Sequence, residues 1–174
     1  AEDGIFRLPN EYPKQALAAI TTHDLPTLAG YWGGVDIEDR WKAGLLPDEK
    51  SYRRQLMERA KDKQRLLEAL FEVGLLPDWF PRQASAVGEL SGELHNAVVG
   101  FLVSTRSALM VLNVEDLFKQ ARQQNLPGSI WQYPNWRRKM AYRLDELVTD
   151  PLARDCTTMF RNWLDRTGRR GRVV

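Results

Sequence analysis

The sequence predicts an α/β fold in which helices outnumber strands, and two observations support this. Residues 16–22 and 108–114 each contain a short, continuous apolar run. Such runs, in contrast to alternating ones, are typical of parallel strands that are covered on both faces. Longer stretches with apolar residues at helical spacing lie between and after the two runs. We therefore expect a mostly helical chain that contains two parallel strands.

The first elements follow from local signals along the chain. Residues 1–15 contain two prolines and are expected to form an irregular lead-in. After the first strand, residues 25–43 are expected to hold one or two helices. Pro26 would then lie in a first helical turn, and the pair Gly33-Gly34 interrupts the stretch.

Two longer helices are predicted in the middle of the chain. The first covers 51–73 and ends at Gly74. Its expected apolar side comprises Leu56, Ala60, Leu67, Leu70 and Phe71. The second covers 85–105 and has the most regular helical period in the chain, although its three glycines oppose helix formation.

The last third begins with the second strand at 108–114. A helix is predicted over 115–123, and a loop rich in Pro, Gly and aromatic residues over 124–136. A final amphipathic helix carries the apolar residues Leu152, Cys156, Met159, Phe160 and Trp163. Residues 168–174 are expected to form a frayed basic tail.

Length and composition indicate one soluble domain. A chain of 174 residues can bury a single core. The net charge of +2 gives no argument for nucleic acid or for an acidic partner, and we expect neither nucleic acid nor a membrane as a partner. No apolar run approaches the roughly 18 residues that a membrane span needs. The single cysteine, Cys156, cannot form an intramolecular disulfide, so we expect a reduced, buried thiol and a cytoplasmic location.

Two strands among several helices cannot form a closed sheet. A parallel strand with an unpaired edge promotes association. The organisation therefore predicts that upstream structure, or a second copy of the chain, completes the sheet.

The first candidate site is the pair His23-Asp24, which follows the first strand and precedes a helix. Barrel enzymes keep their chemistry at such strand ends. Two structural alternatives remain open at this point. Asp24 could be a helix N-cap that accepts a backbone N–H near Thr27, and His23 could be a structural histidine.

The second candidate site is the aromatic loop. Trp131, Tyr133 and Trp136 lie near Asn125 and Asn135 in the sequence. Pyranose rings offer apolar faces for aromatic stacking and hydroxyls for hydrogen bonds to amides, so this mixture suits a sugar. The alternative is that the aromatic residues only fill space between neighbouring elements.

Three segments together resemble the 4-alpha-glucanotransferases, also called amylomaltases or disproportionating enzymes. They are Thr21-Thr22-His23-Asp24-Leu25-Pro26-Thr27-Leu28-Ala29-Gly30-Tyr31-Trp32, Asn125-Leu126-Pro127-Gly128 and Pro134-Asn135-Trp136-Arg137-Arg138-Lys139. The resemblance implies that residues 1–174 are the C-terminal part of a (β/α)8 TIM-type catalytic barrel. It also implies an enzyme that transfers alpha-1,4-glucan segments between maltooligosaccharides with retention of configuration, without a cofactor or metal.

The resemblance further implies roles for individual residues. Asp24 would bind ring hydroxyls of the donor glucose and favour the oxocarbenium-like transition state. His23 would donate a hydrogen bond to the same sugar. Asn125, Pro127 and Gly128 would border the glucan cleft. Asn135 and Trp136 would also contact the glucan, or would instead hold the loop to the barrel. Tyr31 and Trp32 are expected to pack beneath the site.

Retaining glycosyl transfer needs two further carboxylates about 5–5.5 Å apart. In the family both lie on earlier strands. Five carboxylates of this chain have solvated or capping explanations instead: Asp36, Glu38, Asp39, Glu115 and Asp116. We therefore expect the chain alone to be inactive. No cluster has metal-ligand spacing, and His95 is expected to be a polar helix position.

Two other functions remain as alternatives. A non-enzymatic helical interaction module would bury its strands against a partner and bind no saccharide. A polyanion-binding domain would use the basic tail, and its binding would weaken steeply with salt.

Overall fold

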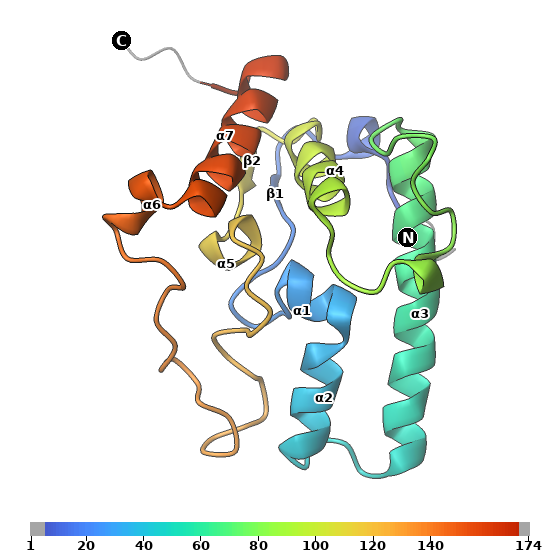
Figure 1. The fold of residues 1–174 in the computed structure, drawn as a ribbon. Coiled ribbons are helices and arrows are strands. Elements are labelled where there is room, and N and C mark those ends of the chain that lie inside the picture. The colour runs from blue at the N-terminus through green and yellow to red at the C-terminus, as the bar shows by residue number, and fades with distance from the viewer. Residues whose placement is uncertain (1–5, 171–174) are drawn as a thin grey trace.

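The computed structural model describes residues 6–170 and shows a mostly helical chain around one short two-stranded sheet (Figure 1). Its elements are, in order, a 3-10 turn at Pro9–Glu11, β1 (Leu17–Ala19), α1 (Leu28–Gly33), α2 (Val35–Lys42), α3 (Glu49–Glu72), a 3-10 turn at Ala84–Ala86, α4 (Gly92–Val103), β2 (Leu109–Val111), α5 (Val114–Leu117), α6 (Glu146–Thr149) and α7 (Pro151–Arg166). The start of the predicted lead-in, residues 1–5, and the end of the predicted tail, residues 171–174, lie outside the described residues.

The two strands pair in parallel, as predicted, but each is shorter than its apolar run. Leu17 pairs with Leu109 in the register. One face of the pair packs on the protein, where Ala18 is buried. The other face is open, since the side chains of Leu17 and Leu109 are 57% and 64% exposed. The expectation of cover on both faces is therefore wrong for this chain, because residues 6–170 supply a layer on one side only.

Helices α1 and α2 confirm the prediction of two helices within residues 25–43. Gly34 adopts a left-handed conformation with φ of 74°, which ends one helix and begins the next. Thr27 is the N-cap of α1 and accepts the Gly30 N–H at 3.1 Å. Pro26 therefore precedes the cap and does not lie in the first turn. Trp32 is buried as expected, and its indole N–H donates to the Val87 carbonyl at 3.0 Å.

Helix α3 confirms the first long helix, with Asp48 as its N-cap and Gly74 just beyond its end. Its C-terminal half carries the buried residues of the main core, including Leu67 and Leu70. Its N-terminal half was predicted to be apolar on one side, but Leu56 and Ala60 are exposed. Charged side chains dominate that half of the helix, so little apolar surface is available to bury.

Helix α4 begins at Gly92, seven residues later than predicted. The Ser91 hydroxyl accepts the Leu94 N–H at 3.2 Å and caps the helix there. The predicted helix over 115–123 is also too long, because α5 ends at Leu117 and Lys119 has a positive φ of 53°. The first error arises because Ser91 caps α4 inside the apolar stretch. The second arises because the chain turns at Lys119.

The aromatic loop over 124–136 is irregular, as predicted, and the final helix appears as α7. Cys156 on α7 is only half-buried, although burial raises the pKa of its thiol. The expectation of a frayed tail is wrong for Arg169, whose guanidinium donates to the carbonyls of Val103 at 2.7 Å and Ser107 at 2.8 Å. Among residues 6–170, no helix is both long and apolar enough to cross a membrane.

The packing of α7 on α4 depends on Gly100. A Cβ at this position would lie 2.4 Å from Cζ2 of Trp163. We expect Gly100→Ala to lower the free energy of unfolding by about 1–3 kcal/mol through overpacking. Gly92→Ala in the same helix is the matched control, because nothing lies within 4 Å of its added Cβ.

Urea unfolding of both variants tests this prediction. Gly92→Ala should keep or raise the midpoint, since alanine is the better helix former by up to about 1 kcal/mol. Equal midpoints for the two variants would show that the contact between Gly100 and Trp163 does not constrain the fold.

Candidate functional site

A pocket of about 400 Å³ lies at the C-terminal ends of both strands. Residues from the end of β1, the end of β2 and the aromatic loop line it together. They are Leu17, Ala19, Thr21, Thr22, His23, Leu25, Thr27, Val111, Asn113, Glu115, Gln123, Gln124 and Trp136. The pocket therefore joins the two regions that the sequence marked as candidate sites.

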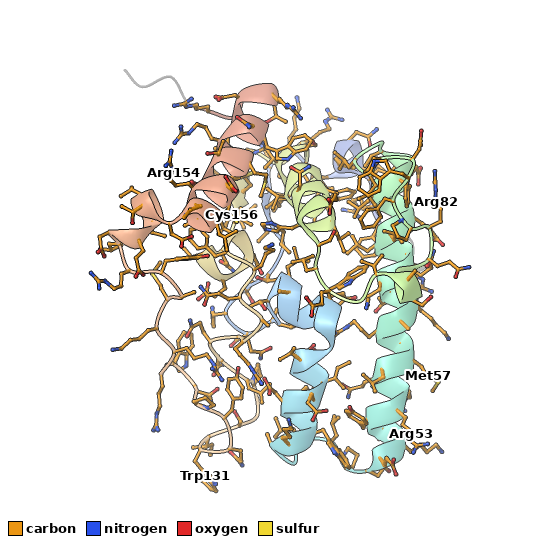
Figure 2. The ribbon with its side chains drawn as sticks, in the orientation of Figure 1. Arg53, Met57, Arg82, Trp131, Arg154 and Cys156 are labelled. Atoms are coloured by element: carbon orange, nitrogen blue, oxygen red, sulfur yellow. The ribbon has the colours of Figure 1, made fainter. Side chains whose placement is uncertain are left out.

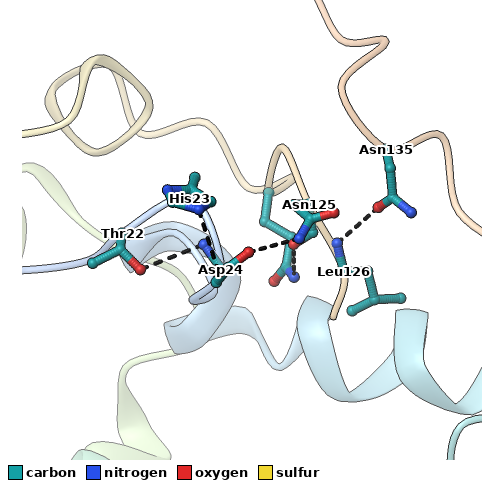
Figure 3. Close-up of polar contacts among 7 residues, drawn as sticks. Thr22, His23, Asp24, Asn125, Leu126 and Asn135 are labelled. Carbon is teal, nitrogen blue, oxygen red and sulfur yellow. Dashed lines mark hydrogen bonds and ion pairs between the residues drawn. The ribbon is translucent and has the colours of Figure 1, made fainter. Parts of the chain in front are cut away.

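Asp24 lies beside this pocket and does not cap a helix. Its Oδ1 accepts a hydrogen bond from Asn125 Nδ2 at 2.6 Å, and its Oδ2 lies 3.3 Å from His23 Nε2 (Figure 3). The capping alternative is wrong, because Thr27 provides the N-cap of α1. About half of the Asp24 side chain remains exposed, at 51%. The carboxylate is thus oriented by two neighbours and still accessible to a ligand.

The ring of Trp136 lies beside the histidine of this pair. The centroids of the His23 and Trp136 rings are 5.3 Å apart. The backbone N–H of Trp136 donates to the Gln124 carbonyl at 2.9 Å and closes the base of the aromatic loop. Trp136 also has a positive φ of 58°, a conformation that costs a bulky residue about 1–3 kcal/mol. This strain indicates that contacts with the rest of the fold, and not the backbone preference of tryptophan, hold Trp136 at the pocket wall.

Asn135 stabilises the aromatic loop through hydrogen bonds of its side chain. Its Oδ1 accepts the Leu126 N–H at 2.8 Å (Figure 3). Its Nδ2 donates to the Ser129 hydroxyl at 2.9 Å. These contacts fit the alternative role in which Asn135 holds the loop.

Pro127 and Gly128 form the turn that follows Asn125, where Gly128 has a φ of 86° that favours glycine. They are not among the residues that line the pocket.

The other two aromatic residues of the loop differ in burial. Tyr133 is buried, and its hydroxyl donates to the Gln123 carbonyl at 2.8 Å. It therefore fills the space between the loop and α2, as the packing alternative expects. Trp131 is 81% exposed and lies at the far tip of the loop (Figure 2). Only Trp136 of the three lines the pocket.

Asp116 was expected to be a solvated or capping residue, but the structure gives it a buried structural role. It is fully buried, and its Oδ1 accepts the Leu28 N–H at 2.7 Å while its Oδ2 accepts the Thr21 hydroxyl. Burial raises the pKa of this carboxyl. Thr21 and Leu28 lie immediately before and after residues 22–27. One carboxylate therefore fixes both ends of the segment that carries His23 and Asp24.

His95 packs against the same region from α4. It is buried, and its Nε2 lies 2.9 Å from the Asp116 carbonyl. Burial lowers its pKa to about 4, so the imidazole is neutral at pH 7 and its Nε2–H donates to the carbonyl. The expectation of an ordinary polar helix position is wrong. Among residues 6–170, no group of three or more His, Cys, Asp or Glu residues could hold a metal ion.

Two of the carboxylates that were expected to be solvated are instead buried in ion pairs. Asp36 accepts two hydrogen bonds of 2.7 Å from the guanidinium of Arg59. Asp39 pairs with Arg122. Their partners lie on α3 and in the segment after α5, so the sequence pattern around each aspartate gave no signal of the pairing.

Glu115 is a second carboxylate at the pocket. It is partly buried and lines the pocket together with His23. Its Oε1 accepts a hydrogen bond from Gln124 Nε2 at 2.8 Å. Glu115 was expected to be a solvated or capping residue, but it lines the pocket. It follows the second strand as Asp24 follows the first.

Three comparisons with known proteins agree on one family. A family model described as 4-alpha-glucanotransferase matches residues 1–145. The 4-alpha-glucanotransferase of Haemophilus influenzae is 32% identical over 142 residues, which cover 82% of this chain and 20% of that protein. The 4-alpha-glucanotransferase of Mycobacterium bovis is 34% identical over 131 residues, which cover 75% of this chain and 17% of that protein.

The structural comparison gives the same result. The crystal structure of amylomaltase from Corynebacterium glutamicum matches with a TM-score of 0.76 and 29% identity, over 88% of this chain and 23% of that chain. The chain thus spans about a fifth of the length of the curated relatives it matches.

Proposed function

The chain belongs to the 4-alpha-glucanotransferase family, and from this membership we propose that it forms the C-terminal part of a (β/α)8 catalytic barrel. The whole protein would transfer alpha-1,4-glucan segments between maltooligosaccharides by a retaining double displacement. One observation carries this proposal. The Asp24 carboxylate lies accessible at the end of β1, held by Asn125 and His23 and free of any capping role.

Asp24 would act on the donor sugar without becoming its nucleophile. In a retaining transfer, positive charge develops at the anomeric carbon and the ring oxygen as the glycosidic bond breaks. Hydrogen bonds from ring hydroxyls to a carboxylate strengthen as that charge develops. Asn125 donates to Oδ1 and His23 Nε2 lies 3.3 Å from Oδ2, so each oxygen of Asp24 keeps a second lone pair for a sugar hydroxyl.

His23 and Trp136 would form the adjoining wall of the cleft. The imidazole of His23 lies between Asp24 and the Trp136 ring and is well exposed, so it can hydrogen-bond a hydroxyl of the same sugar. The exposed face of Trp136 offers an apolar surface for a pyranose ring. The nucleophile and the acid/base would come from other strands of the barrel, about 5–5.5 Å apart.

The open face of the strands supports an incomplete barrel. Leu17, Leu109 and Val111 are exposed and belong to the same face of the sheet. We propose that further strands of the same protein cover this face. Association of the chain through the same face is the alternative, and it is the observation that favours an interaction module as the second candidate function.

A comparison of two proteins tests the proposal. The first is the 174-residue chain alone, incubated with maltotriose. The second is a chimera in which this chain replaces the matching segment of the Haemophilus influenzae 4-alpha-glucanotransferase. We expect glucose and longer oligosaccharides from the chimera and none from the chain alone.

Two results would contradict this account. A folded chimera without transfer activity would refute the assigned function. Turnover by the chain alone would refute the claim that both missing carboxylates lie elsewhere. Glu115 would then be the carboxylate to substitute first, because it lines the same pocket as His23.

A further inference from the structure

A second hollow of this chain is surrounded by positive charge. It measures about 470 Å³ and is lined by Gln120, Ala121, Arg122, Pro134, Arg137, Arg138 and Lys139. None of these residues lines the pocket beside Asp24. Four of the seven are basic, although the net charge of the whole chain is only +2. The lining of this hollow is therefore strongly basic in a chain of nearly balanced charge.

Two of the guanidinium groups are held by buried partners. Arg122 pairs with Asp39, whose side chain is buried, while about half of the Arg122 side chain remains exposed. The guanidinium of Arg138 lies 5.1 Å from the ring centroid of the buried Tyr133. Both arginines are thus oriented before any ligand arrives, which lowers the entropy cost of binding.

The positive charge is largely uncompensated. Within the described residues, Arg122 is the only one of the four basic side chains with a carboxylate oxygen within 4.0 Å. The Nε of Arg138 is also buried without a hydrogen-bond partner in this part of the chain. Buried donors in native proteins nearly always have a partner, so the hydrogen-bonding capacity of the Arg138 guanidinium is not used up by the protein.

The backbone around the hollow is firmly connected. Its two segments, 120–122 and 134–139, are joined next to the hollow by the hydrogen bond from the Trp136 N–H to the Gln124 carbonyl. Tyr133 adds a second connection through its hydroxyl and the Gln123 carbonyl. The basic side chains therefore project from segments whose relative position is fixed.

We propose that this hollow binds a dianionic phosphate group, either as free phosphate or as the phosphate ester of a sugar. Arginine matches phosphate oxygens with paired N–H donors, and lysine adds a point charge. Arg138 would bind a phosphate oxygen through its guanidinium, with Arg137 and Lys139 on the open side. The site is separate from the proposed glucan cleft and does not depend on that function.

A titration of the ¹⁵N-labelled chain tests this proposal. Inorganic phosphate and glucose 1-phosphate are added at constant ionic strength, and glucose is the uncharged control. We expect saturable NMR shifts at Ala121, Arg122 and residues 137–139 with both phosphates and none with glucose. Equal affinities would assign recognition to the phosphate alone, and tighter binding of the ester would add its sugar; either result supports the site.

Matched charge variants exclude general attraction to a basic protein. The double variant Arg137→Gln, Arg138→Gln should lose about tenfold in affinity for each arginine. The double variant Arg53→Gln, Arg54→Gln removes the same charge from exposed positions of α3 and should bind as the original chain does. Lys139→Gln, at an exposed position, provides a second pocket variant if the first fails to fold.

The proposal is overturned by either of two outcomes. Shifts that do not saturate, or that spread over the surface, would show non-specific attraction. Equal affinity of the two double variants would show that the hollow is not the binding site.

Discussion

Asp24→Asn in the chimeric enzyme is expected to lower kcat for maltotriose transfer by at least about a hundredfold. Asparagine keeps the size of the side chain and can still accept the hydrogen bond from Asn125. It removes the negative charge that would stabilise the oxocarbenium-like transition state. Hydrogen bonds of this kind contribute several kcal/mol in glycoside chemistry, and each 1.4 kcal/mol corresponds to tenfold in rate.

The matched control for this variant is Asp78→Asn. Asp78 is fully exposed and pairs with Arg82 on the surface. Its substitution should leave kcat and KM unchanged. If Asp24→Asn keeps more than half of the activity of the chimera, the carboxylate does not act in the transition state.

Asp116→Ala is expected to lower the free energy of unfolding by about 3 kcal/mol. The substitution leaves the Leu28 N–H and the Thr21 hydroxyl without their acceptor in the interior. It also opens a small cavity beside His95. Urea unfolding measures the effect as a lower midpoint with an unchanged slope.

The same variant should loosen residues 22–27 before the rest of the chain. Amide hydrogen exchange is the readout, because it measures local opening in the folded state. Asp36→Ala is the control, since it also removes a buried carboxylate but leaves the contacts of Thr21 and Leu28 intact. Equal exchange rates for residues 22–27 in the two variants would contradict the role assigned to Asp116.

Elements with local signals were predictable from the sequence. The parallel strands follow from two continuous apolar runs, and the helix ends at Gly34 and Gly74 follow from glycines that adopt positive φ. The long helix α3 was placed to within two residues at its start and one at its end. Each of these features depends on residues that are neighbours in the chain.

Elements that depend on distant contacts were not predictable in this way. Asp116 is held by Leu28, which lies 88 residues earlier, and the pairing of Arg122 with Asp39 spans 83 residues. A helix was predicted over 115–123. The chain instead turns at Lys119, and the segment that follows places Arg122 beside Asp39.

The sequence predicted candidate site residues only within the segments that carry the family resemblance. His23, Asp24, Asn125 and Trp136 lie together in the structure, and the binding roles that the resemblance implies for them stay predictions. Glu115 and Asp116 were passed over, because a carboxylate after a strand looks the same in sequence whether it is solvated, buried or at a pocket. Only the partners that the fold brings to them distinguish these cases.

A titration of the ¹⁵N-labelled chain with maltotriose tests the central claim most directly. If the end of β1 and the aromatic loop form part of a glucan cleft, the Trp136 indole and the Asn125 side-chain amide should shift saturably. The exposed indole of Trp79, which lies outside the pocket, should not change. An unchanged Trp136 signal, or an equal shift at Trp79, would contradict the assignment of this pocket to the glucan.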